Sequence, residues 1–194
     1  MADNDSFRSF MFSYLEYILE SQDTGEVERV KTNIEVCWDT LAEMGVDFPY
    51  DELFRQFYEL LDSLIERGQA AISAEELLQK CRDPCYSNFI VMFLRCVTAS
   101  QIYKYRDFYS SSYIDQCASP REMRTLEFDR ALDPIGSVLG YPHPAHCAAL
   151  ANALGVPIMV VHLIPASLCD MDDSARHLVN LLCRDGHFDI IYRS

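Results

Sequence analysis

Apolar residues in the first part of this chain recur at steps of three and four, which is the period of a helix that buries one face. Three such stretches predict helices from about residue 7 to 21, from 27 to 41 and from 53 to 65. Gly45 and Gly68 follow the second and third stretches, and glycine is typical of helix ends. The first third of the chain is therefore expected to be helical.

A buried central helix is expected between residues 86 and 97, where the sequence is apolar nearly all round. A shorter helix is predicted ahead of it, because Ser73 and Glu76 have the spacing of a capping box. Another helix is predicted from about residue 145 to 154, ending at Gly155. All of these helices precede the first segment that has the character of a strand.

Three strand candidates close the sequence. Residues 157–164 form a continuous apolar run rich in Val and Ile, and residues 177–183 and 187–192 follow as shorter candidates. A chain of 194 residues with 49% hydrophobic content can bury one core, and no long linker divides it. We expect one α+β domain over residues 1–194, with a helical first half and a small, mostly antiparallel sheet at the C-terminal end.

Charge and cysteine content narrow the classes of partner and cofactor. The net charge of -14 argues against binding to nucleic acid or to an anionic membrane. The longest apolar stretch, residues 89–94, is far shorter than the roughly 20 residues that span a bilayer, and we predict no signal peptide. The eight cysteines are expected to be reduced, and none has the paired spacing of a zinc site. We therefore predict no metal and no cofactor.

His187 and Asp189 occupy alternate positions of the last predicted strand, so their side chains share one face. Phe188, Ile190 and Tyr192 would pack behind them. A carboxylate on that face can orient an imidazole as the general base of a nucleophilic hydrolase. The same spacing also occurs in strands whose polar face is only solvated, so the pair by itself leaves both interpretations open.

Six sequence blocks stand in one order along almost the whole chain. The blocks are Phe7–Glu16, Phe89–Ala99, Asp107–Tyr109, Asp133–Ile135, His146–Val156 and Gly186–Tyr192. In these blocks the chain resembles the otubain branch of the ovarian-tumour (OTU) family of cysteine-type deubiquitinases. The resemblance implies a papain-like OTU fold, hydrolysis of isopeptide bonds after ubiquitin, His187 and Asp189 as base and orienting acid, and a location in cytoplasm and nucleus.

The nucleophile position is where the chain departs from that family. The family pattern Asp-Gly-Asn-Cys falls on residues 2–5, so Asn4 matches and Asp5 stands in place of the cysteine. A carboxylate cannot replace a thiolate of lowered pKa, so the resemblance predicts a hydrolytically inactive or impaired member. A gap of one residue would instead place Ser6 there. The alternative is therefore an active isopeptidase that uses Ser6, or another nucleophile, with His187 and Asp189.

Two simpler expectations accompany this interpretation. Asp5 or Ser6 could serve as the cap of the first helix, where Asp and Ser are favoured. None of the eight cysteines is expected to face His187, because the resemblance places the element of each one away from the first helix.

The resemblance also implies partners. These are ubiquitin or polyubiquitin, with ubiquitin-conjugating enzymes as a further class, and Asn4 and His146 are the candidate ubiquitin contacts. A helix-start histidine bonded to nearby backbone is an equal interpretation of His146. Family members carry more sequence before the nucleophile, which helps to hold ubiquitin and conjugating enzymes, so the domain is expected to be truncated at its N-terminus.

Overall fold

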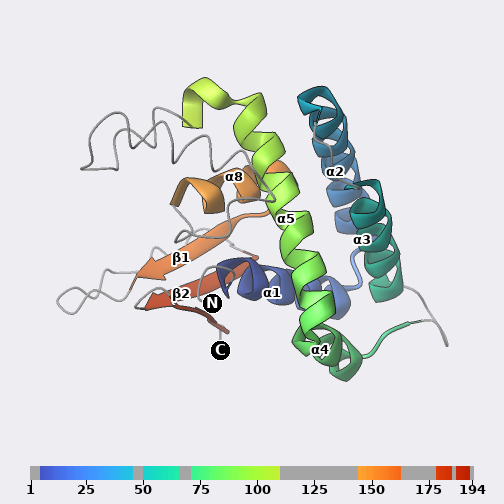
Figure 1. The fold of residues 1–194 in the computed structure, drawn as a ribbon. Helices are drawn as coiled ribbons and strands as arrows, with labels where there is room; N and C mark the ends of the chain where they lie inside the picture. The colour runs from blue at the N-terminus through green and yellow to red at the C-terminus, as the bar shows by residue number, and fades with distance from the viewer. Residues whose placement is uncertain are drawn as a thin grey trace.

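The structure is a computed structural model that describes residues 5–45, 50–65, 71–109, 144–162, 178–184 and 187–192. Helices come first and strands last, as Figure 1 shows. The elements are α1 (Asp5–Ser21), α2 (Thr24–Met44), α3 (Tyr50–Ile65), α4 (Ala74–Arg82), α5 (Pro84–Lys104), α8 (Pro144–Leu154), β1 (Ile158–His162), β2 (Val179–Arg184) and β3 (His187–Ile190). The α+β class and the predicted order of elements are confirmed.

Side-chain caps set where several helices begin. The Asp23 carboxylate accepts a hydrogen bond from the Glu26 amide at 3.0 Å, so α2 starts three residues before the apolar stretch that predicted it. The capping box before α4 is confirmed, since Ser73 Oγ accepts from the Glu76 amide while the Glu76 carboxylate accepts from the Ser73 amide. Apolar periodicity alone could not locate these boundaries.

The hydrophobic core is organised around α5, which lies between the α2–α3 pair on one side and α8 with the sheet on the other (Figure 1). Phe93 of α5 is fully buried, stacks on Phe57 with ring centroids 4.0 Å apart, and meets the edge of Phe54 at 5.2 Å. Both partners come from α3, and such aromatic pairs stabilise a core beyond their buried area alone. The expectation of a buried central helix is confirmed.

The sheet has the strand order β1-β2-β3 in the part of the chain that the structure describes. β1 and β2 are parallel, with Ile158 opposite Val179, whereas β2 and β3 are antiparallel, with Arg184 opposite His187. The prediction of a mostly antiparallel sheet is therefore right for β2–β3 and wrong for β1–β2. Apolar runs identify strands but carry no information about their relative direction, which explains the difference.

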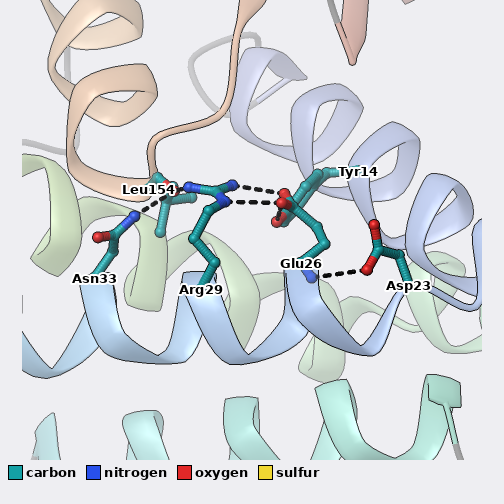
Figure 2. Close-up of polar contacts among 6 residues, drawn as sticks. All are labelled: Tyr14, Asp23, Glu26, Arg29, Asn33 and Leu154. Carbon is teal, nitrogen blue, oxygen red and sulfur yellow. Dashed lines mark hydrogen bonds and ion pairs between the residues drawn. The ribbon is translucent and has the colours of Figure 1, made fainter.

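Polar contacts fix the C-terminal end of α8 on α2 (Figure 2). Arg29 Nη1 and Asn33 Nδ2 each donate to the Leu154 carbonyl at 2.9 Å. The Arg29 guanidinium is also paired with the Glu26 carboxylate, which in turn accepts from the Tyr14 hydroxyl at 2.7 Å. A carbonyl that a helix end would leave unpaired is thereby satisfied. This network joins α1, α2 and α8.

Gly155 follows α8 with φ +66°, the left-handed conformation that suits glycine at a helix end. A Cβ at this position would lie 2.3 Å from Arg29 Nη1 and 3.0 Å from Asn33 Nδ2. Glycine is therefore required here both for its backbone conformation and for space.

No described helix is long and apolar enough to cross a bilayer.

Candidate functional site

β3 places His187 and Asp189 on one exposed face, while Phe188 and Ile190 are partly buried against the core. The alternation predicted for this strand is confirmed for these four residues, whereas Tyr192 is 67% exposed and does not pack behind the strand as expected. His187 lies opposite Arg184 of β2, and Asp189 lies opposite Leu182. Two side chains that could act as a base and its orienting acid therefore project from the same side of the strand.

α1 lies alongside β3 and the residues just after it, with hydrogen bonds toward both ends of this contact. Ser9 Oγ donates to the Phe188 carbonyl at 2.7 Å, and the Tyr192 hydroxyl donates to Glu16 Oε2 at 2.9 Å. The seven-residue step from Ser9 to Glu16 spans about 10 Å of helix, and the four-residue step from Phe188 to Tyr192 about 13 Å of extended chain. The two elements therefore run in the same direction, and the first turn of α1 lies toward the His187 end of β3.

Asp5, the residue that the resemblance aligned with the nucleophile, is the first residue of α1. Residues four apart lie on the same helical face, so position 5 shares the face from which Ser9 reaches β3. The side chain of Asp5 and the whole of Asn4 lie outside the described residues, so the expected contact of Asn4 with ubiquitin stays a prediction. The expected helix start at residue 7 is two residues too late. Ser6 is inside the first turn, so it does not precede the helix as a cap would.

Ser6 is only 4% exposed and lines a small pocket between α1, α8 and the sheet. The pocket is largely apolar and is formed by Ser6, Phe7, Phe10, His146, Cys147, Leu150, Ile158 and Leu181. His187 is not one of its lining residues. Ser6 is thus buried among apolar residues of α1, α8 and the sheet, which is a poor location for a nucleophile that has to meet a macromolecular substrate.

Cys147 lies in this pocket next to Ser6, so the expectation that every cysteine is remote from the first helix is wrong for Cys147. That expectation considered which element carries each cysteine, and it missed that the starts of α1 and α8 line a common pocket. Burial, with a smaller contribution from Cys183, raises the pKa of the Cys147 thiol to about 11. The thiol is therefore protonated at neutral pH and is not an activated nucleophile.

His146 lies in the first turn of α8, is partly buried and lines the same pocket. Its role as a ubiquitin contact stays a prediction.

The six cysteines among the described residues are free thiols. Within those residues no group of three His, Cys, Asp or Glu side chains is arranged to hold a metal ion.

The match to a family model decides the relationship. The model of the otubain peptidases, Peptidase C65 Otubain, matches residues 4–193. The chain belongs to the otubain family. Within that family it is 37% identical over 218 residues to the OVARIAN TUMOR DOMAIN-containing deubiquitinating enzyme 1 of Arabidopsis thaliana, covering 97% of this chain and 66% of that protein.

Human ubiquitin thioesterase OTUB1 is a more distant otubain, 26% identical over 203 residues that cover 98% of this chain and 67% of OTUB1. The chain thus spans about two thirds of the length of these two relatives. Among solved structures, an h/ceOTUB1–ubiquitin aldehyde–UBC13~Ub complex matches with a TM-score of 0.76 at 19% identity, over 98% of this chain and 73% of the matched chain. That likeness shows the otubain fold.

Proposed function

We propose that this otubain binds ubiquitin or polyubiquitin and does not hydrolyse isopeptide bonds. The observation that carries the proposal is the aspartate at the first position of α1, next to a strand that keeps His187 and Asp189 on one exposed face. The relatives named as a deubiquitinating enzyme and as a ubiquitin thioesterase support ubiquitin as the ligand. The base and its orienting acid are retained, and the nucleophile is absent.

The chemistry of position 5 explains the expected loss of activity. Cysteine-type hydrolysis needs a thiolate that an imidazole and a helix N-terminus keep deprotonated. An aspartate carboxylate is ionised at neutral pH and is a poor nucleophile toward an amide.

The substitutes for the missing thiol are unfavourable. Ser6 is buried in a pocket that His187 does not line, and Cys147 is protonated at neutral pH because burial raises its pKa to about 11. Both arguments count against the alternative of an active isopeptidase. They support a protein that recognises ubiquitin without cleaving its linkages.

Ubiquitin-conjugating enzymes are the second class of proposed partner. Structures similar to this chain include an h/ceOTUB1–ubiquitin aldehyde–UBC13~Ub complex and an h/ceOTUB1–ubiquitin aldehyde–UBCH5B~Ub complex. The chain covers 73% and 72% of the matched chains. For a protein with these partners we propose a location in cytoplasm and nucleus.

The test is cleavage of a panel of diubiquitin linkages by three proteins: the parent, Asp5→Cys, and Asp5→Cys combined with His187→Ala. We expect the parent to be silent and Asp5→Cys to cleave at least one linkage. Adding His187→Ala should then reduce the rate by about 10²–10⁴-fold, the usual contribution of a general base.

Binding is measured separately, because it has to persist without chemistry. The parent and Asp5→Ala are both expected to bind ubiquitin in a titration followed by ubiquitin amide resonances. Cleavage by the parent that disappears in Ser6→Ala would establish the active-isopeptidase alternative. Failure of both binding and Asp5→Cys cleavage would refute the proposed function.

A further inference from the structure

The register of β3 determines which way its backbone groups point. The Ile191 amide donates to the Asn180 carbonyl at 2.9 Å, which makes Asn180 and Ile191 a hydrogen-bonded pair of the antiparallel ladder. Hydrogen-bonded and non-hydrogen-bonded pairs alternate along such a ladder. Phe188, opposite Cys183, therefore occupies a non-hydrogen-bonded pair. Its carbonyl points away from β2, toward the outer edge of the described sheet.

Ser9 of α1 satisfies that outward carbonyl. Its Oγ donates to the Phe188 oxygen at 2.7 Å, and the bond joins residues 179 positions apart in the sequence. Phe188 is the residue between His187 and Asp189, and Ser9 lies one turn after position 5 on the same face of α1. The bond therefore connects the nucleophile position to the base through one helical turn and one strand residue.

We propose that Ser9 is a positioning residue that sets the placement of His187 and Asp189 relative to the first turn of α1. Its catalytic consequence rests on the proposed function, in which Asp5→Cys restores a working site. A second hydrogen bond, from Tyr192 to Glu16, lies beyond the C-terminal end of β3, and Tyr192 is 67% exposed. That bond is too distant and too solvated to fix His187.

The first test uses the parent chain and needs no activity. The ring resonances of His187 are assigned by NMR and compared between the parent, Ser9→Ala and Ser63→Ala at one pH. Ser63 is a matched control, because its Oγ also donates to a backbone carbonyl at 2.7 Å, but within its own helix to Leu60. We expect Ser9→Ala to shift or broaden the His187 resonances and Ser63→Ala to leave them unchanged.

Rescue distinguishes the hydroxyl from the shape of the side chain. Ser9→Thr keeps the donor and is expected to return the His187 resonances to their parental positions. If Ser9→Ala does not fold, Ser9→Cys replaces it, because a thiol has a similar shape and is a weaker donor. Unchanged His187 resonances in a folded Ser9→Ala or Ser9→Cys protein, or equal changes in Ser63→Ala, would overturn the proposal.

The second test adds Ser9→Ala to Asp5→Cys and measures diubiquitin cleavage. We expect kcat to fall about fivefold with KM nearly unchanged, since the bond affects the alignment of the reacting groups and not ubiquitin binding. A rise in KM at constant kcat would contradict a positioning role. If Asp5→Cys itself is inactive, the His187 resonances alone decide the role of Ser9. The proposed function fails only if ubiquitin binding is absent as well.

Discussion

Replacing Gly155 with alanine is a direct test of how α8 is attached to the helical scaffold. The new methyl group would lie 2.3 Å from Arg29 Nη1, well inside van der Waals contact, and the guanidinium would have to move. Movement removes its 2.9 Å bond to the Leu154 carbonyl and disturbs its pairing with Glu26. The substitution also places a Cβ on a residue whose φ is +66°.

The expected cost follows from these two effects. A left-handed conformation costs an alanine about 1–2 kcal/mol. Loss of one hydrogen bond from a partly exposed arginine adds about 1 kcal/mol. The sum is about 2–3 kcal/mol, which for a chain of this length lowers the melting temperature by roughly 4–12 °C. Thermal unfolding followed by circular dichroism measures this fall in melting temperature.

Gly45 provides the matched control. It ends α2 with φ +65°, nearly the same conformation, but a Cβ there would meet nothing within 4 Å. Gly45→Ala should therefore show only the conformational cost, about 1–2 kcal/mol or roughly 2–8 °C. The difference between the two variants isolates the collision with Arg29.

A double-mutant cycle with Arg29→Ala completes the test. Once the guanidinium is removed, Gly155→Ala should cost about as little as Gly45→Ala, so the two changes at Gly155 and Arg29 should be non-additive by about 1 kcal/mol. If Gly155→Ala and Gly45→Ala lower the free energy of unfolding of the parent protein by equal amounts, the reasoning is refuted. Strict additivity of Gly155→Ala and Arg29→Ala would do the same.

Two further predictions concern buried ionisable groups. Tyr14→Phe removes the 2.7 Å bond to Glu26 and should lower the free energy of unfolding by about 1 kcal/mol in urea titrations, because Glu26 keeps its pairing with Arg29. Burial raises the pKa of the Cys96 thiol from 9.0 to about 12, so above pH 9 the unfolded chain loses a proton that the folded chain keeps. The free energy of unfolding should therefore fall as the pH rises. Cys96→Ala should reduce this fall by about 1.4 kcal/mol per pH unit between pH 9 and 11. An unchanged dependence on pH would contradict the raised pKa of this thiol.

Local sequence patterns were sufficient to predict the helices and strands and the exposed face of β3. Helical periodicity identified the buried residues of α1, α2 and α3, and the Ser73–Glu76 spacing identified a cap that the structure contains. Alternation placed His187 and Asp189 together on β3. Each of these features is set by residues close in sequence, so the sequence carries its signal.

Contacts between distant segments could not be predicted. Arg29 and Leu154 are 125 positions apart, and periodicity says that a face is buried without saying against which helix. The proximity of Cys147 to Ser6 and the parallel pairing of β1 with β2 have the same origin. These features depend on how the elements pack, and no spacing within one element reports them.

The bond between Ser9 and Phe188 also has a consequence for synthesis of the protein. Its two partners lie near opposite ends of the described chain, so the contact cannot form until a ribosome has released almost all of it. Helices α1 to α5 can begin to pack during translation, because their contacts lie within the first part of the sequence. The site between α1 and β3 is therefore completed after the helical scaffold, and partly synthesised chains contain the scaffold without the site.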